Sequence, residues 1–257
     1  MHKTFLMTLV MHLLIPSLAN AEKLCVDQDL GAAPDGRMLG HLPYTEVRPS
    51  DLVAAPAGFA LNGRCLLRRE ARTDLVRLIA AADAVPGLAG KIRAVSCFRT
   101  VTHQQLVFCG QIGPGKRHRD AADRARFVGP PGYSEHATGY AIDFGTRPSP
   151  TCGDVSACFA ATAAGRWLLA HAPEFGFELS FPVGNAQSVT WEPWHWRWVG
   201  ADLSVPGSAI ARSIFVRARR DFPAQPTTAD TAIRAIIPPP PPTLIITPST
   251  GLPPVYP

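Results

Sequence analysis

The 257-residue sequence lacks any block of about five or more charges of one sign. It has 25 lysine and arginine residues against 20 aspartate and glutamate residues, a formal charge of +5, and its densest basic clusters, at 116–119 and 217–220, are short. Domains that bind nucleic acid usually carry a longer basic patch or stripe. The sequence therefore indicates no nucleic-acid partner. Its mild basic excess favours at most a weak attraction to an anionic polymer surface such as a cell wall.

Long apolar runs are also missing. The apolar stretch Phe5–Ile15 is shorter than the roughly 20 residues that span a bilayer. It follows a basic start at residues 1–3 and precedes the small-residue pattern Ala19-Asn20-Ala21, which is the order of a secretory signal. We therefore predict a signal peptide over residues 1–21, export to the periplasm, the cell wall or the medium, and no stable membrane insertion after cleavage.

The sequence contains no C-x-x-C pair, which argues against a zinc cluster built on cysteines. Its six cysteines are an even number and suit disulfides in an oxidising compartment. Many pairings are possible. Because closing a longer loop costs more entropy, near neighbours are the default partners. This predicts Cys97 with Cys109 and Cys152 with Cys158, which leaves Cys25 with Cys65.

The composition changes near Phe222. Residues 223–257 contain 11 of the 26 prolines, including an unbroken run at 238–242. Consecutive prolines favour an extended polyproline conformation and offer no backbone donors to a sheet. We therefore predict a single domain over residues 22–222, which is long enough for a good core, and a Pro-rich disordered tail over residues 223–257. A docking peptide within the tail is the alternative.

Hydrophobic periodicity predicts both helices and strands. Helices are expected over residues 73–84, 102–108, 160–172 and 208–220, and extended segments over residues 91–98, 140–144, 177–181 and 191–199. Thr73 is expected to cap the first helix, and Pro86-Gly87 to end it. These elements do not alternate as βαβ units. The pattern favours an α+β fold with a small, largely antiparallel sheet flanked by helices.

Two short segments place groups that are costly to bury among apolar and aromatic residues. In S-E-H-A-T-G-Y-A-I-D, at residues 134–143, Asp143 follows His136 by seven positions. In W-E-P-W-H-W-R-W, at residues 191–198, Glu192 precedes His195 by three. Catalytic zinc typically takes three histidine or carboxylate ligands plus water. His136, Asp143 and His195 could supply such a set, which leaves Glu192 as a base beside the metal.

Each of these residues also has an ordinary structural interpretation. A histidine beside aromatic residues is more often a core or surface residue than a ligand. Asp143 could serve in a turn, and Glu192 could form a plain ion pair with Arg197. The spacing alone leaves these alternatives open.

Three segments, in order, resemble the zinc D-alanyl-D-alanine carboxypeptidases, which include the carboxypeptidases of vancomycin resistance. S-E-H-A-T-G-Y-A-I-D resembles the S-x-H-x-x-G-x-A-x-D element of that family, and E-P-W-H-W-R-W-V-G, at 192–200, resembles its E-P-W-H-x-R-[YW]-V-G element. Ser96 to Thr100, with Gln104 following, resembles its S-x-[YF]-R-[ST]-x3-Q segment. The agreement covers roughly residues 71–200. It implies the fold that this family shares with lysostaphin-type peptidases and the hedgehog signalling domain.

The resemblance also implies a cofactor and a set of roles. Zn2+ is expected as the cofactor, with His136, Asp143 and His195 as its ligands, Glu192 as the catalytic base, Arg99 stabilising the oxyanion or substrate carbonyl, and Gln104 and Ser134 near the substrate's terminal carboxylate. Cys97 departs from the family pattern, which more often has a small or other residue there.

The implied activity is removal of the terminal D-alanine from peptidoglycan stem peptides, which are the expected partners. L,D-carboxypeptidase, dipeptidase and endopeptidase activities on peptidoglycan are alternatives, because they depend on pocket depth and loops. A non-catalytic, zinc-stabilised module that binds the cell wall is another. Glu192 favours an enzyme, because a binding module needs no base beside its metal. The sequence does not indicate the oligomeric state.

Overall fold

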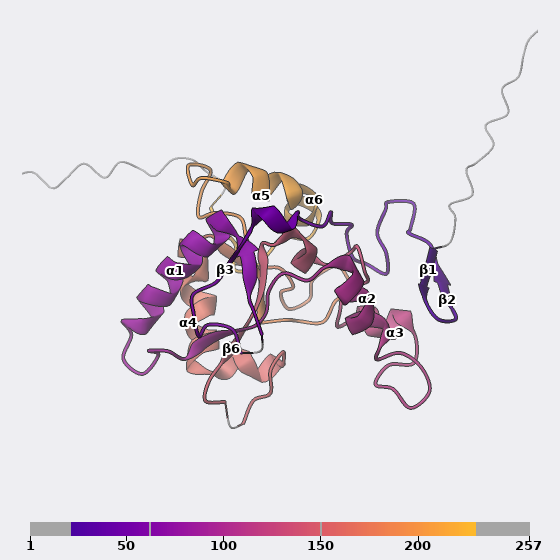
Figure 1. Ribbon diagram of the computed structural model, residues 1–257, viewed down its shortest axis with the longest axis horizontal. Coiled ribbons are helices and arrows are strands. Elements are labelled where there is room, and N and C mark those ends of the chain that lie inside the picture. The colour runs from indigo at the N-terminus through magenta and orange to yellow at the C-terminus, as the bar shows by residue number, and fades with distance from the viewer. Residues whose placement is uncertain (1–21, 62, 150, 230–257) are drawn as a thin grey trace, which may run out of the picture.

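A computed structural model of the protein describes residues 22–61, 63–149 and 151–229 (Figure 1). The expected signal peptide, residues 1–21, and most of the expected tail lie outside the described residues. Across the described ranges, no helix has the length and apolar character needed to cross a membrane.

The elements form a mixed fold around one four-stranded antiparallel sheet of order β5-β6-β8-β7. The strands are β1 (Glu22–Cys25), β2 (Gln28–Leu30), β3 (Leu52–Ala54), β4 (Leu66–Arg68), β5 (Ile92–Ser96), β6 (Ala141–Thr146), β7 (Phe177–Leu179) and β8 (His195–Trp198). The helices are α1 (Arg69–Asp83), α2 (Val101–Cys109), α3 (Ala121–Ala125), α4 (Ala163–His171), α5 (Ser208–Ile214) and α6 (Val216–Asp221), with short 3-10 helices η1 (Pro49–Asp51), η2 (Glu135–Thr138), η3 (Ala157–Ala161) and η4 (Ala172–Phe175). This architecture confirms the predicted α+β class.

The four-stranded sheet has one apolar face and one polar face, because successive side chains of a strand point in opposite directions. The apolar face carries Ile142, Phe144, Phe177, Leu179, Trp196 and Trp198, all of which are buried. The polar face carries Asp143, Glu178, His195 and Arg197, which alternate with them and are buried too. The sheet therefore buries charged groups on one side and needs partners for each of them there.

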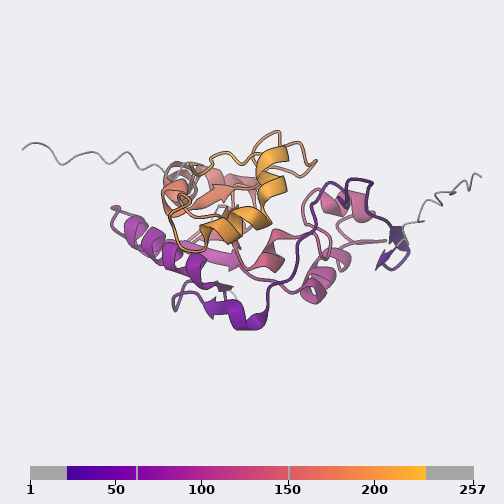
Figure 2. The ribbon, with the colours of Figure 1, turned by 90° about the horizontal axis from the view of Figure 1, so that it is seen from above.

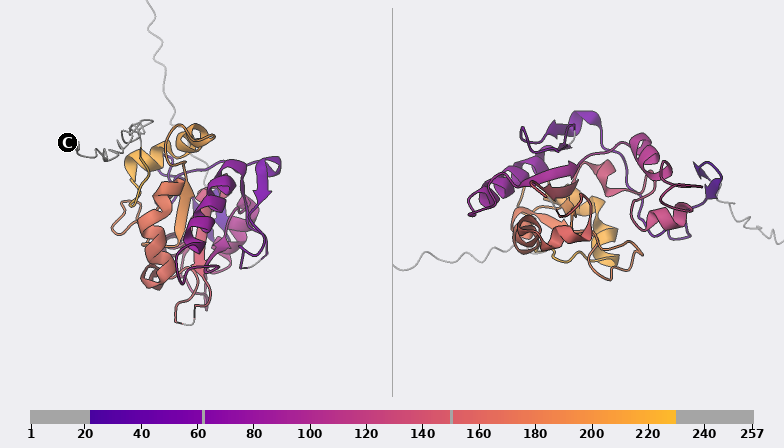
Figure 3. Two further views of the ribbon diagram at one scale, coloured as in Figure 1. Left: turned by 90° about the vertical axis from the view of Figure 1, so that its left-hand side faces the viewer. Right: turned by 90° about the horizontal axis from the view of Figure 1, so that it is seen from below.

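Helices cover the sheet on both sides (Figures 2 and 3). Helix α1 buries Leu75 and Leu78, and the Trp198 indole Nε1 donates a 2.9 Å hydrogen bond to Asp74 in the same helix. Each fully buried leucine stabilises the fold by roughly 1.5–3 kcal/mol. On the polar side, the Arg197 guanidinium lies 5.3 Å from the centre of the Phe215 ring, at the junction of α5 and α6. Phe215, between the two C-terminal helices, therefore packs against a buried cation of the charged face.

Several element boundaries differ from the sequence-based expectation. Helix α1 begins at Arg69, so Thr73 lies inside it, and the Thr73 hydroxyl donates to the Arg69 carbonyl. The single helix expected over 208–220 breaks at Phe215, whose backbone angles leave the helical region. Of the extended segment 191–199, only β8 pairs as a strand. Local propensity set the type of these elements, whereas tertiary contacts set their ends.

Two of the three disulfides predicted from loop length are wrong. The structure pairs Cys25 with Cys109, Cys65 with Cys97 and Cys152 with Cys158, with Cα–Cα distances of 5.6, 5.1 and 5.7 Å. Cys109 ends the nine-residue helix α2, which rises about 1.5 Å per residue away from Cys97. The Phe98 amide donates to the Leu66 carbonyl, which brings Cys97 beside Cys65 instead. The pairing that closes the shorter loop for Cys97 therefore does not form, because helix α2 separates Cys97 from Cys109.

Removing the bridge between Cys65 and Cys97 should destabilise the protein strongly. These cysteines are 32 residues apart, so a Cys65→Ala/Cys97→Ala variant is expected to lose about 3–4 kcal/mol of unfolding free energy in a denaturant titration. The matched control removes Cys152 and Cys158, which are six residues apart, and should lose about 2 kcal/mol. Equal losses, or peptide mapping that links Cys97 to Cys109, would contradict this disulfide arrangement.

The described chain stays packed beyond Phe222. The Leu179 amide donates to the Pro226 carbonyl at 3.0 Å, and the Gln225 amide donates back to the Leu179 carbonyl at 3.3 Å. The Thr227 hydroxyl donates to Glu178 at 3.0 Å. Proline lacks a backbone donor but tolerates the edge of a sheet, and its carbonyl can still accept. Residues 224–229 therefore lie along the outer edge of β7, past the boundary expected from composition.

Candidate metal-binding and catalytic site

His136 is positioned by the short helix η2. The Ser134 hydroxyl caps this helix by accepting a hydrogen bond from the His136 amide at 3.4 Å. Gly139 ends it with a φ of 74°, a left-handed conformation that favours glycine, and a Cβ there would lie 2.8 Å from Leu52 Cδ2. These two residues explain the S-x-H-x-x-G spacing physically. They turn the chain so that the imidazole enters the polar side of the sheet.

Asp143 and His195 are direct cross-strand partners. Asp143 lies on β6, and the register places it opposite His195 on β8. His195 Nδ1 lies 2.9 Å from Asp143 Oδ1. Residues opposite each other on an antiparallel pair share a face, so the sheet itself brings the second motif to the first.

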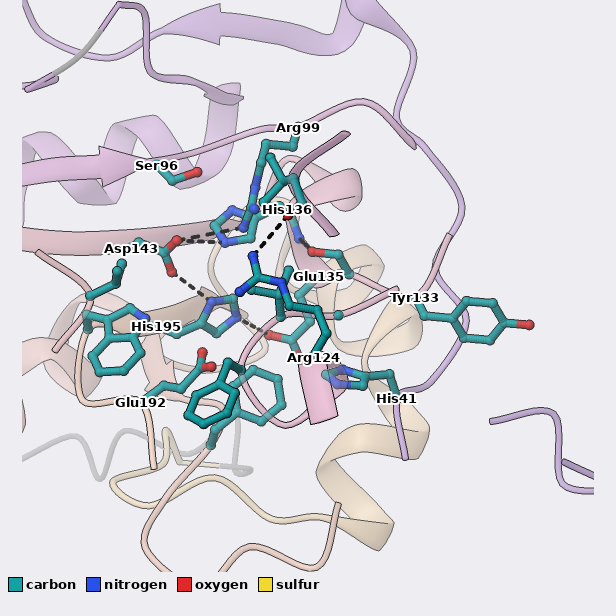
Figure 4. Close-up of a pocket in the computed structure, with 18 of the residues that line it drawn as sticks. His41, Ser96, Arg99, Arg124, Tyr133, Glu135, His136, Asp143, Glu192 and His195 are labelled. Atoms are coloured by element: carbon teal, nitrogen blue, oxygen red, sulfur yellow. Dashed lines mark hydrogen bonds and ion pairs between the residues drawn. The ribbon is translucent and has the colours of Figure 1, made fainter. Parts of the chain in front are cut away.

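The nitrogen and oxygen atoms of these three side chains converge. One atom each from His136, Asp143 and His195 can be chosen so that all lie within 4.8 Å of one another, and all three residues are buried (Figure 4). His136 Nδ1 donates to the Cys97 carbonyl at 2.6 Å, which leaves Nε2 as its lone-pair nitrogen. Nε2 lies 3.1 Å from Asp143 Oδ2, yet it forms no hydrogen bond and is buried. A buried acceptor without a partner, beside a carboxylate and a second imidazole, fits a divalent metal ion.

The two imidazoles differ in charge. Burial lowers the pKa of His136 to about 4, and the charge of Arg99 acts in the same direction. Burial also opposes protonation of His195, but hydrogen bonds to Asp143 and Glu135 outweigh it and raise its pKa to about 10. Burial would raise the pKa of the Asp143 carboxyl, but the hydrogen bond and positive charge of protonated His195 act against it, and the pKa lies far below its usual range. A metal ion in this group would replace the proton between His195 and Asp143.

Glu135 lies behind the converging side chains and bonds to one of them, a role for which the sequence patterns give no prediction. Its Oε2 accepts from His195 Nε2 at 3.0 Å and from the Ser180 hydroxyl at 2.6 Å. Its Oε1 accepts from Arg197 Nη1 at 2.8 Å. A carboxylate on the far nitrogen of a metal-ligating histidine fixes the ring's tautomer and orientation. The only sequence signal for this role is the position of Glu135 beside His136.

Arg197 lies behind the converging side chains as well, and Glu135 and Arg197 together form a supporting layer. Arg197 is fully buried, and its Nε donates to Glu178 Oε1 at 2.8 Å in addition to its bond to Glu135. The plain ion pair between Glu192 and Arg197, which the sequence left open, is therefore replaced by pairs with two other carboxylates. Glu192 is left facing the cavity.

Glu192 and Arg99 flank the converging atoms (Figure 4). Glu192 is 6% exposed, and burial raises the pKa of its carboxyl to about 8, with the Asp143 charge contributing in the same direction. Its backbone is held at both ends, because its amide donates to the Phe181 carbonyl and its carbonyl accepts from the His195 amide. Arg99 Nη2 lies 3.7 Å from Asp143 Oδ2, and its Nε is buried without a partner. The site therefore combines one buried carboxylate and one partly buried cation beside the converging side chains.

Comparison with known proteins places this arrangement in a family. The family model VanY, described as D-alanyl-D-alanine carboxypeptidase, matches residues 64–201, more than half of the chain. The chain belongs to this family.

Individual relatives agree. Carboxypeptidase YodJ of Bacillus subtilis (strain 168) is 31% identical over 158 residues, which cover 59% of this chain and 54% of that protein. The bifunctional D-Ala-D-Ala dipeptidase and D-Ala-D-Ala carboxypeptidase VanXYC of Enterococcus gallinarum is 29% identical over 154 residues, 59% of this chain and 75% of its own. The chain thus spans about half the length of the first relative. Among solved structures, the LdcB LD-carboxypeptidase superposes with a TM-score of 0.53 at 25% identity and covers 74% of this chain and 84% of that one.

The two residues that family resemblance places near the substrate's carboxylate lie differently in this VanY-family chain. Ser134 lines a cavity of about 410 Å³ together with His136, Asp143, His195, Glu192 and Arg99. Gln104 is buried but lies outside the cavity lining, and its side-chain amide donates to the Gly129 carbonyl at 2.5 Å. Trp194 and Phe181 also line the cavity, whereas Trp196 is buried in the core.

Proposed function

We propose that this VanY-family protein is a zinc-dependent D-alanyl-D-alanine carboxypeptidase that trims peptidoglycan stem peptides. The observation that carries the proposal is the convergence of His136 Nε2, Asp143 and His195 Nδ1 on the wall of a cavity that also holds Glu192 and Arg99. Two imidazoles and one carboxylate, each oriented by a further hydrogen bond or strand pairing, suit catalytic zinc.

In this proposal His136, Asp143 and His195 hold the zinc ion, and the Cys97 carbonyl and Glu135 orient the two rings. Zinc in such a site supplies Lewis acidity, polarising the scissile carbonyl and acidifying water. Side chains of this protein would bind the substrate, transfer the proton and stabilise the developing negative charge. Because His136 is neutral near pH 7, its Nε2 can ligate without first losing a proton.

Glu192 acts as the general base and acid. It takes a proton from the attacking water and returns it to the leaving amine. Burial raises the pKa of the Glu192 carboxyl to about 8 without metal. The charge of a zinc ion beside it would lower that pKa again, toward the working pH at which a group that must do both works best. Arg99 donates hydrogen bonds to the substrate carbonyl oxygen as negative charge develops there. Its unpartnered Nε leaves donor capacity for that contact.

The substrate is bound, in this proposal, with Ser134 and Gln104 on the side of its terminal carboxylate. Ser134 lines the cavity and could contact substrate directly. Gln104 would act by holding the Gly129 backbone at the cavity's edge, since its amide is bonded there.

The proposed place of action is outside the cytoplasm. Three disulfides and no free cysteine among the described residues suit an oxidising compartment. Export through the expected signal peptide, removed after Ala21, would deliver the enzyme to peptidoglycan in the periplasm or the cell wall.

Mass analysis of the products from defined muropeptides tests the proposal. We expect the full chain with zinc to release one D-alanine from a stem pentapeptide and a chelator to abolish the release. Loss of alanine from the tetrapeptide alone would indicate an L,D-carboxypeptidase. Release of the D-Ala-D-Ala dipeptide would indicate a dipeptidase, and cleavage of a cross-linked dimer an endopeptidase. If zinc-loaded protein releases nothing from any of these substrates, the peptidase proposal fails and a zinc-stabilised binding module takes its place.

A further inference from the structure

Arg124 is a buried cation in the cavity wall that the proposed reaction does not use. It lies in the short helix α3, lines the cavity and is 8% exposed. Figure 4 shows it on the same cavity as Glu135, His136 and His195. Burial lowers the pKa of Arg124, with the charges of Arg117 and Arg99 acting in the same direction. The fold therefore bears the cost of burying this guanidinium near two other arginines.

No carboxylate of the described residues forms an ion pair with Arg124. Its Nη2 donates to the Val107 carbonyl at 2.9 Å, and its Nη1 lies 3.2 Å from His118 Nε2. Because a guanidinium can only donate, His118 Nε2 must accept here. The proton of His118 is then on Nδ1, which faces Asp123 Oδ2 at 3.4 Å. Both contacts of Arg124 are thus with neutral groups, and its Nε is buried without a partner.

Outside the proposed catalytic group, the Asp, Glu, Lys and Arg side chains of the cavity lining are Arg117 and Arg124 alone. The acidic residues in the lining are Glu135, Asp143 and Glu192, all of which belong to the proposed catalytic group. A cationic wall that holds an unpartnered guanidinium donor is complementary to an anionic ligand group.

We propose that Arg124, oriented by His118 and Val107, binds a carboxylate of the peptide substrate and so determines which peptides the site accepts. The proposal rests on the proposed function for the identity of the ligand as a stem peptide. The carboxylate has two possible sources, the peptide's C-terminus or a side chain within the stem. Val107 is one helical turn from Gln104 on α2, so Arg124 is tied to the element expected on the side of the terminal carboxylate.

Calorimetric binding to the zinc-loaded Glu192→Gln variant tests this without requiring turnover. Three peptides are compared: a stem pentapeptide with all of its carboxylates, its C-terminal amide, and a version with lysine and D-isoglutamine in place of the internal acidic residues. Adding Arg124→Gln is expected to weaken binding of the first peptide by about tenfold to a hundredfold, the range of a lost hydrogen bond to a charged group. The matched control is Arg126→Gln, an exposed arginine two positions away that lies outside the cavity lining.

The peptides separate the two sources. If the C-terminal carboxylate is the ligand, the Arg124→Gln penalty disappears for the amide and persists for the peptide without internal acids. If an internal carboxylate is the ligand, the pattern reverses. An equal penalty on all three peptides, no penalty, or no binding of any peptide overturns the proposal.

Arg124→Lys guards against a folding defect, because it keeps the charge but loses the planar fork. It should weaken binding of only the peptides that Arg124→Gln affects, and by less. Failure of the proposed function would look different, since wild-type protein would then release no product.

Discussion

Replacing Glu192 by glutamine is expected to slow D-alanine release from a stem pentapeptide by at least a factor of about 100, or about 2.7 kcal/mol in the barrier. Glutamine keeps the size and hydrogen-bonding capacity of the side chain but cannot accept the proton of the attacking water, and a general base typically contributes about 10²–10⁴ in rate. Zinc content and the thermal midpoint should stay near those of the wild type, because Glu192 is outside the converging group and its backbone bonds are unchanged.

Glu174→Gln is the matched control, because Glu174 is exposed and pairs only with His171 among the described residues. It should leave turnover unchanged. The assignment of Glu192 would be refuted by a Glu192→Gln protein that holds full zinc and turns over within a few-fold of the wild type. Loss of zinc in that variant would instead make Glu192 a ligand.

The parts of the fold that could be predicted are those in which local chemistry and tertiary packing agree. Thr100 caps α2 through a hydrogen bond from the His103 amide, and that helix appears within a residue of its expected limits. An extended segment was expected over 140–144 because these residues are apolar apart from Asp143, and the structure forms β6 there and buries it on both faces. Such segments can be predicted from local sequence, because hydrophobic periodicity and helix capping depend on neighbouring residues.

The disulfides and the supporting layer could not be predicted in this way. Cys25 and Cys109 are 84 residues apart, and nothing in their local sequence indicates that β1 lies beside α2. Glu135 reads as one more polar residue of a turn until the fold brings Ser180, His195 and Arg197 around its carboxylate. Partners of this kind are set by tertiary structure, which a single sequence does not encode in any short pattern.

The direction of the Gln104 side chain also depends on tertiary structure and could not be predicted from local sequence. Its spacing from Arg99 agrees with the family pattern, and from this we expected a side chain facing substrate. The structure buries it and bonds its amide to the Gly129 carbonyl. Spacing fixes which turn of α2 carries the residue, but the direction of its amide depends on the loop that packs against the helix. Arg124 lines the cavity from α3, the short helix that precedes Gly129, and it belongs to none of the three sequence motifs.

Removing either proposed imidazole ligand should abolish zinc binding and, with it, activity. Two substitutions can do this while keeping the hydrogen bond that positions each ring. In His136→Asn, the amide nitrogen takes the place of Nδ1 and can still donate to the Cys97 carbonyl, but nothing replaces Nε2. In His195→Gln, the amide nitrogen takes the place of Nε2 and can still donate to Glu135, but nothing replaces Nδ1.

Both variants are expected to hold far less than one zinc per chain by elemental analysis after dialysis, and to release no measurable D-alanine, because two ligands do not make a three-ligand catalytic site. His103→Gln provides the control, since His103 is exposed and belongs to no converging group within the described residues. Circular dichroism should show that both variants remain folded, because each retains the bond to its supporting group. A folded His136→Asn or His195→Gln protein with a full complement of zinc would show that the metal is held elsewhere, and the site drawn from His136, Asp143 and His195 would have to be abandoned.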